Sequence, residues 1–128
     1  MAKTNYESVR DWRERNSVKW KAQSKRYYEK NKAIISKKNS QRNYENKIIC
    51  LAFYSNNECI CNCCGEFRIE FLTIDHIYND GAKHRKEMKS SIFHWLIKND
   101  FPQGFQVLCM NCNFSKGIHG YCPHEEEK

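Results

Sequence analysis

The sequence of 128 residues contains neither glycine nor proline before Gly65, and it has only two prolines in all. Because glycine and proline most often interrupt helices, the first half can be helical without a break, and the turns must lie in the second half. No run approaches about 18 consecutive apolar residues, which excludes a transmembrane helix. The first seven residues lack the apolar segment of a secretory signal, so we expect a cytoplasmic protein.

The basic residues are concentrated in the first part of the chain. Residues 1–49 contain fourteen Lys and Arg against five Asp and Glu, a net charge of +9, whereas residues 50–128 carry a net charge of −2. An arm with this charge is expected to bind a polyanion. Nucleic acid is the leading candidate for that partner, and an acidic membrane surface is the second.

Residues 1–49 are predicted to form a basic helical arm. An Arg-x-aromatic pattern recurs every 16 residues, and a broken apolar stripe follows helical spacing through Val9, Trp12, Trp20, Tyr27 and Ile34. The alternative is a solvated, partly disordered tail. In the functional interpretation, Arg and Lys contact phosphates while aromatic rings contact sugars or bases. The expected contacts with nucleic acid are Arg10, Arg13, Arg26, Lys30 and Arg42, with Arg85 in the second part of the chain.

Residues 50–128 are predicted to form a second module, giving an α+β fold overall. The apolar residues 48–54 are expected to dock the arm onto this module. Its expected elements are strands at residues 71–74 and 105–108, a turn at residues 79–81, a helix over residues 84–99, and a short helix from Cys112 to Lys116 that Gly117 ends.

Eight cysteines in a reducing compartment indicate metal binding better than disulfide bonds. Cys61 and Cys64 form a Cys-x-x-Cys turn followed by Gly65, and Cys109 and Cys112 form another. Two such turns supply four thiolates in a tetrahedral arrangement, which suits structural Zn²⁺. A site with four cysteine ligands has no open position, so this ion would stabilise the fold rather than catalyse a reaction.

Other assignments of the cysteines stay open. Cys59 and Cys63 offer alternative registers for the first turn, and a redox dithiol or unrelated buried thiols is a weaker alternative to the metal site. Cys50 is expected in the core. The segment from Cys122 to His124 is either a partial second metal site or, as we prefer from the sequence, a structural end with a spare thiol.

Asp75 and His76 lie between the two cysteine turns, and Asn113 and Lys116 directly follow the second turn. In this order and spacing, residues 61–117 resemble the HNH (ββα-metal) endonucleases. The likeness is greatest to the zinc-knuckle branch, which includes phage resolvases and small phage nucleases. The specificity comes from the combination of the motifs, because an Asp-His pair alone carries no information.

The resemblance implies a zinc-stabilised ββα-metal module that hydrolyses phosphodiester bonds of double-stranded DNA with Mg²⁺ or Mn²⁺. It assigns His76 as the general base, Asp75 and Asn113 as ligands of the catalytic ion, and Lys116 as a phosphate contact. A hard cation on oxygen ligands neutralises the phosphate, and an imidazole accepts a proton from water at neutral pH. Small size and many Lys, Asn and Ile residues are typical of a phage or mobile-element protein in a bacterial cytosol.

The chain departs from the family pattern at one position. The middle Asn of the motif is expected about five residues before Cys109, where this sequence has Gly104; Gln106 or Asn99 could substitute for it. The second candidate function is a zinc-containing module that binds DNA without catalysis, and the third is a structural factor bound to RNA or protein. Whether a homodimer forms is not determined by the sequence.

Overall fold

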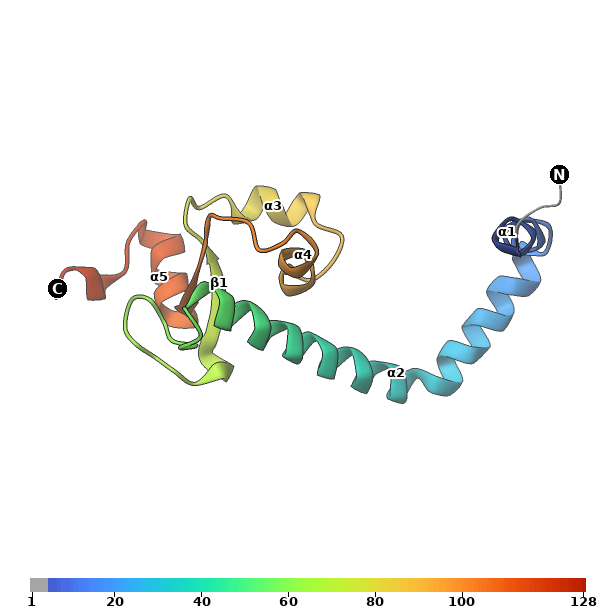
Figure 1. Ribbon diagram of the computed structural model, residues 1–128, viewed down its shortest axis with the longest axis horizontal. Helices are drawn as coiled ribbons and strands as arrows, with labels where there is room; N and C mark the ends of the chain where they lie inside the picture. The colour runs from blue at the N-terminus through green and yellow to red at the C-terminus, as the bar shows by residue number, and fades with distance from the viewer. Residues whose placement is uncertain (1–4) are drawn as a thin grey trace. The chain divides into compact units, whose positions relative to one another are not determined.

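The computed structural model describes residues 5–128 (Figure 1). The chain divides into two compact units, residues 1–40 and residues 41–128. The division therefore lies nine residues before the expected boundary between residues 49 and 50. The division falls within one helix, α2 (Ser17–Tyr54). Residues 17–40 of this helix belong to the first unit, and residues 41–54 belong to the second.

Residues 5–40 are helical, as predicted, with one interruption at Asn16. Helix α1 (Asn5–Arg15) ends before this residue, and α2 begins after it at Ser17. The side chain of Asn16 donates to the carbonyl oxygen of Trp12 at 3.0 Å, and its backbone N–H lies 2.9 Å from the same oxygen. Asn31 makes the same side-chain bond to Tyr27 at 2.8 Å inside the continuous α2, so this bond alone does not interrupt a helix.

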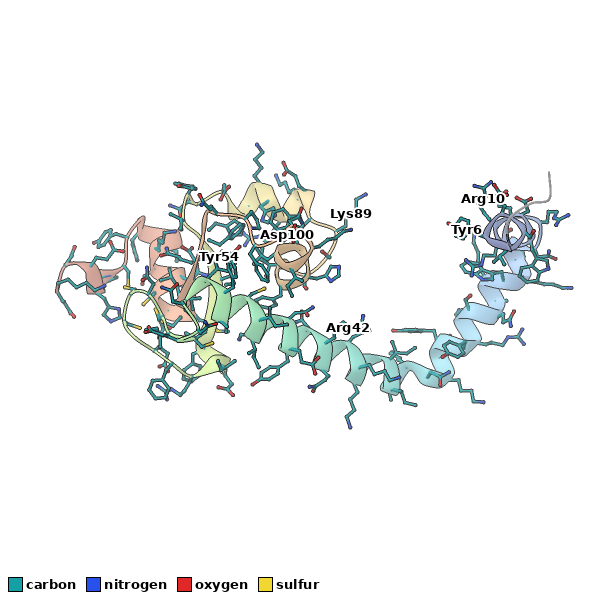
Figure 2. All side chains as sticks on the ribbon, in the orientation of Figure 1. Tyr6, Arg10, Arg42, Tyr54, Lys89 and Asp100 are labelled. Carbon is teal, nitrogen blue, oxygen red and sulfur yellow. The ribbon has the colours of Figure 1, made fainter. Side chains whose placement is uncertain are left out.

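The apolar stripe of the arm does not form a core. Trp12, Tyr27 and Ile34 are 45, 66 and 58% exposed. Figure 2 shows the side chains of α2, Arg42 among them, extending away from the helix axis. Within residues 5–128, no helix is both long and apolar enough to cross a membrane.

The last turn of α2 enters the core of the second unit. Cys50 and Leu51 are completely buried, and Phe53 stacks on Phe101 with ring centroids 4.3 Å apart. The hydroxyl group of Tyr54 donates to the carbonyl oxygen of Pro102 at 2.7 Å (Figure 2). The predicted docking segment is therefore part of this core, although Ile48 and Ile49 remain exposed.

Two antiparallel strands form the sheet of the second unit. Strand β1 (Leu72–His76) pairs with β2 (Phe105–Cys109), so that Leu72 lies opposite Cys109 and Asp75 lies opposite Gln106. The predicted strand at residues 71–74 is shifted, because a 3₁₀ turn (Ile69–Phe71) precedes β1. Helix α5 (Met110–His119) follows β2 without a loop, which gives the order strand, strand, helix (Figure 1).

The predicted helix over residues 84–99 is wrong in its extent. Two helices, α3 (Gly81–Glu87) and α4 (Ile92–Lys98), replace it. Met88 leaves the helical conformation with ψ of 135°, and the Ser91 hydroxyl accepts from the backbone N–H of His94 at 3.3 Å. Serine is a favoured N-cap, so Ser91 begins a new helix where the apolar periodicity alone predicted a continuous one.

The predicted end of the last helix is also wrong. Gly117 lies inside α5, and the helix instead ends at Gly120, whose φ is +81°. The N–H of Gly120 donates to the carbonyl oxygen of Lys116, a C-cap in which the left-handed conformation favours glycine. A short 3₁₀ turn (Pro123–Glu125) follows near the C-terminus.

We expect Leu51, near the C-terminal end of α2, to contribute more to stability than Ile34 in the middle of the helix. Leu51→Ala should lower the free energy of unfolding by about 2–5 kcal/mol, because it leaves a cavity in the core. The matched control Ile34→Ala should change it by less than about 0.5 kcal/mol, because Ile34 is exposed. Urea unfolding followed by circular dichroism measures both, and equal losses would contradict this description of the core.

Candidate functional site

The first cysteine turn is attached to the sheet by backbone hydrogen bonds. Cys61 donates its N–H to the carbonyl oxygen of Glu66 at 2.8 Å, and Asn62 donates to Val107 of β2 at 2.8 Å. Gly65 has φ of +76° and donates to the carbonyl oxygen of Cys61 at 3.0 Å. The turn is therefore closed by the glycine that the sequence places there, and it lies beside the end of β2.

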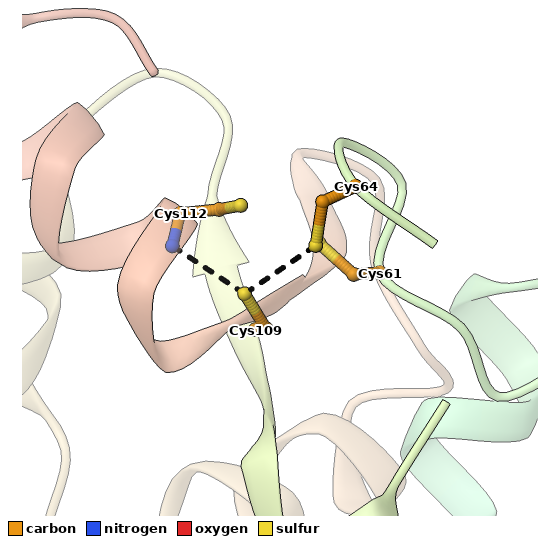
Figure 3. Close-up of side chains that lie close together, drawn as sticks. All are labelled: Cys61, Cys64, Cys109 and Cys112. Atoms are coloured by element: carbon orange, nitrogen blue, oxygen red, sulfur yellow. Dashed lines mark hydrogen bonds between the residues drawn. The ribbon is translucent and has the colours of Figure 1, made fainter. Parts of the chain in front are cut away.

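The two Cys-x-x-Cys turns bring their thiols together (Figure 3). The Sγ atoms of Cys61, Cys64, Cys109 and Cys112 all lie within 4.8 Å of one another. Those of Cys64 and Cys109 are 3.7 Å apart. Four sulfurs at about 2.3 Å from a zinc ion would be about 3.8 Å apart. The structure therefore brings the four predicted thiols together, and the cluster could hold a metal ion such as structural zinc.

Backbone groups favour the thiolate form of Cys61, whereas burial raises the pKa of Cys64 and of Cys112. Burial acts to raise the pKa of Cys61, but hydrogen bonds from backbone groups of both turns outweigh it and lower that pKa to about 7. Cys50 is outside the cluster, and burial raises the pKa of its thiol to about 11. The prediction that Cys50 is a core residue is confirmed, since its side chain is fully buried.

A second group of ligands adjoins the first. Cys63, Cys112, Cys122 and His124 also place their ligand atoms within 4.8 Å of one another. The sequence analysis preferred a spare thiol at Cys122, whereas the structure brings Cys122 and His124 against the first turn. The signal that could have found this group is Cys63 itself, a third cysteine inside a turn that needs only two.

A cavity of about 570 Å³ lies where β1 ends and α5 begins its first turns. Its lining includes all four predicted catalytic residues and one predicted DNA contact: Asp75, His76, Asn113, Lys116 and Arg85. Adjacent residues of a strand point to opposite faces, so Asp75 and His76 need partners on both sides of β1. Helix α5 and helix α3 provide them, and Figure 1 shows these helices on either side of the strand.

Asp75 is only 5% exposed, and one of its carboxylate oxygens accepts two hydrogen bonds. Its Oδ2 accepts from Lys116 Nζ at 2.7 Å and from Gln106 Nε2 at 2.8 Å. Gln106 in turn accepts, through Oε1, from Asn62 Nδ2 at 3.0 Å, which connects the carboxylate to the first cysteine turn. Of the two proposed substitutes for the missing Asn, Gln106 therefore contacts the site, whereas Asn99 donates to the carbonyl oxygen of Trp95.

Gly104 supports the loop through its backbone rather than a side chain. Its φ is +100°, a conformation that favours glycine, and its carbonyl oxygen accepts from the N–H of Ile77 at 3.0 Å. This bond continues the pairing of the two strands past His76. An asparagine side chain is consequently not needed at residue 104 to close the loop.

His76 forms a pair with a residue that the sequence analysis did not assign to the site. Its Nε2 lies 2.8 Å from Nδ1 of His84 on α3. Burial lowers the pKa of His76, and the charge of His84 lowers it further. A Cβ atom at Gly81 would lie 3.0 Å from Nδ1 of His76, so the glycine keeps that side of the ring open. No sequence pattern pointed to this role for His84.

Asp75 and Asn113, which both line the cavity, carry oxygen atoms of the kind that could hold a divalent cation. Mg²⁺ is usually bound by one or two carboxylates together with water and substrate phosphate. Both hydrogen bonds to Asp75 end on Oδ2, which leaves Oδ1 for a cation, and Asn113 lines the same cavity with an amide oxygen. The ammonium group of Lys116 also donates to the carbonyl oxygen of His76 at 2.8 Å, so it is fixed beside this position.

The residues predicted to contact nucleic acid are all exposed. In α1, Arg10 lies 3.9 Å from a carboxylate oxygen of Glu14, and Arg13 lies over the ring of Trp20 at 5.4 Å. Arg26, Lys30 and Arg42 lie on α2. Arg85 differs from them, because it lines the cavity that contains Asp75 and His76.

Comparison of the chain with models of protein families, with curated proteins and with solved structures gives no match. The chemistry of the site must therefore be argued from its own residues. The two groups of side chains to explain are the cysteine clusters and the cavity between β1 and α5.

Loss of one thiol from the first cluster should release metal. Cys109→Ser should reduce the metal content and the free energy of unfolding, because a structural ion contributes directly to folding. The matched control Cys59→Ser should keep the wild-type metal content, since Cys59 belongs to neither ligand group. Elemental analysis of the purified chains measures this, and an unchanged metal content in Cys109→Ser would contradict the assignment.

Proposed function

We propose that the protein is a metal-dependent DNA endonuclease that hydrolyses phosphodiester bonds. The observation that carries the proposal is the shared cavity of Asp75, His76, Asn113 and Lys116 at the junction of β1 and α5. A buried carboxylate, a neutral imidazole, an amide and an ammonium group are the components that phosphodiester hydrolysis needs. Their order in the chain, together with two Cys-x-x-Cys turns, is also the basis of the resemblance to HNH endonucleases.

His76 is the proposed general base. Its lowered pKa keeps the imidazole neutral at pH 7, which is the form that accepts a proton from water. When the Nε2–H group of His76 donates a hydrogen bond to Nδ1 of His84, the unprotonated Nδ1 of His76 lies on the side that Gly81 leaves open. His84 is thus a positioning residue that sets the tautomer of the base.

Asp75 and Asn113 are the proposed ligands of Mg²⁺ or Mn²⁺. When bound, this ion neutralises the scissile phosphate and stabilises the leaving oxygen. Asp75 is oriented for this role by Gln106, whose amide group fixes Oδ2. Lys116 and Arg85 add positive charge to the same cavity, which favours an anionic phosphate there.

The four-cysteine cluster is proposed to hold structural Zn²⁺. Thiolate ligands in a tetrahedral arrangement select zinc over magnesium, and a complete ligand set leaves no position for substrate. Cys109 ends β2 and Cys112 lies in the first turn of α5, one residue before Asn113. The ion would thereby fix the start of the helix that carries Asn113 and Lys116.

The basic arm is proposed to bind double-stranded DNA. Residues 1–49 carry a net charge of +9, and their predicted contact residues are exposed. Arg and Lys that neutralise phosphates release counterions, so binding of this kind weakens as the salt concentration rises.

One observation favours a second candidate, a zinc-containing module that binds DNA without catalysis. The ion pair between Lys116 Nζ and Asp75 Oδ2 is 2.7 Å long, and both side chains are largely buried. In this alternative the pair is purely structural, and Asp75 binds no cation. The two candidates share DNA binding and differ only in cleavage.

Cleavage of supercoiled plasmid decides between the two candidates. The wild-type protein should nick the plasmid in the presence of Mg²⁺ and not when Mg²⁺ is omitted. His76→Ala should lower the rate by about 10²–10⁴-fold, because it removes the general base. The control His94→Ala, which alters an exposed histidine of α4, should keep the wild-type rate.

Zinc content and circular dichroism should be unchanged in both variants. Wild-type activity in His76→Ala would show that His76 is not the base. Absence of cleavage on plasmid and on branched DNA by the folded, zinc-loaded chain would favour the non-catalytic module.

Neutralising the arm should flatten the salt dependence of DNA binding. Replacement of Arg10, Arg13, Arg26 and Lys30 by Gln should reduce the slope of log K against log salt concentration by up to about 4, since each lost phosphate contact contributes about 0.9. A control in which the three arginines become lysines should keep the slope. Equal slopes for the Gln variant and the wild type would show that the arm does not contact phosphates.

A further inference from the structure

The C-terminal tail has one buried residue, and the proposed nuclease activity does not use it. Residues 120–128 follow α5, and among them Cys122 alone is buried, with 3% of its surface exposed. The tail contains little else that is apolar and packs into the core. A specific interaction at Cys122 is therefore needed to explain why the chain turns back after Gly120.

The imidazole of His124 is separated from two sulfur atoms by the distance expected between two ligands of the same zinc ion. Its Nδ1 is 3.5 Å from Sγ of Cys112 and 3.5 Å from Sγ of Cys122. A zinc ion with bonds of about 2.3 Å to sulfur and 2.0–2.1 Å to nitrogen would separate these ligand atoms by about 3.6 Å in a tetrahedral site. Cys63 completes the set, since all four ligand atoms lie within 4.8 Å of one another.

We propose that Cys63, Cys112, Cys122 and His124 bind a second zinc ion, which shares the thiolate of Cys112 with the ion of the first cluster. Each ion then has four ligands, because the first is bound by the same Cys112 together with Cys61, Cys64 and Cys109. A thiolate sulfur has enough lone pairs to bridge two cations. The result is a dinuclear structural cluster with no open position on either ion.

This arrangement explains the unusual spacing of the first turn. In Cys61-Asn62-Cys63-Cys64, the outer two cysteines face the first ion and Cys63 faces the second. It also explains why Cys112 is completely buried, since a bridging ligand lies between both ions. The second ion attaches the tail to the first turn of α5 by bonds that a poorly packed tail otherwise lacks.

Hydrogen bonding alone accounts for the group less well. Thiols are weak donors and acceptors, so three of them around one imidazole would stabilise the tail little. A disulfide would use two of the three thiols and would leave His124 without a role; all eight cysteines are free in the structure. Six thiolates and two Zn²⁺ carry a net charge of −2, and the hollow beside Cys63 and Cys122 is lined by Lys116, which pairs with Asp75, and by Lys128 and Glu125.

Counting the bound metal in the full chain tests the proposal without reference to DNA cleavage. The protein is expressed with added zinc, dialysed against a weak chelator, and measured by native mass spectrometry and elemental analysis. The wild type should retain two zinc ions per chain. His124→Ala and Cys122→Ser should each retain one, with the first cluster intact and the circular dichroism of the helices preserved.

Two controls keep the count interpretable. His119→Ala removes an exposed histidine at the end of α5, and Cys59→Ser removes a thiol outside both groups, so both should retain two ions. One ion per chain in the folded wild type would overturn the proposal. Two ions in both His124→Ala and Cys122→Ser would also overturn it.

Cobalt substitution tests the shared ligand. Two Co²⁺ ions bridged by one thiolate are magnetically coupled, so the electron paramagnetic resonance signal per ion should fall between the first and the second equivalent of Co²⁺. A signal that grows in proportion through two equivalents would show that Cys112 is not a bridge.

Discussion

The second unit depends on a core in which cysteine thiols occupy many positions that larger apolar side chains usually fill. Of its eleven buried apolar residues, five are cysteines, and four of these belong to the two ligand groups around Cys112. Such a core buries few large side chains, and small domains of this kind generally need a metal or disulfides to fold. The proposed coordination of metal by these thiolates would consequently be the constraint on which the sheet and α5 depend.

The same constraint positions the proposed catalytic groups. Cys109 and Cys112 span the junction of β2 and α5, and the pairing of β1 with β2 then brings Asp75 opposite Gln106. Helix α5 lies on one side of β1 and contacts Asp75 through Lys116, whereas α3 lies on the other and contacts His76 through His84. Two adjacent residues with opposite orientations therefore line one cavity.

Asp75 and His76, which line the same cavity, have different electrostatic surroundings. The buried carboxylate of Asp75 accepts a hydrogen bond from Lys116 Nζ on one oxygen, at 2.7 Å. The pKa of His76 is lowered by burial and by His84, so the imidazole next to that carboxylate stays neutral. The proposed hydrolysis of a phosphodiester would use Asp75 as a metal ligand and His76 as the base.

The sequence by itself determined the elements whose signals are local. The Cys-x-x-Cys spacing, the absence of early glycine and proline, and the apolar strand segments predicted the four-thiol cluster, the helical arm and both strands within a few residues. The split at Ser91 and the end of α5 at Gly120 were decided by local caps, which the apolar periodicity does not take into account. The pairing of His76 with His84 was decided by the tertiary structure, which brings α3 against the end of β1. The position of Cys122 and His124 beside Cys63 is the strongest example, because only the folded chain brings ligands about sixty residues apart within reach of one ion.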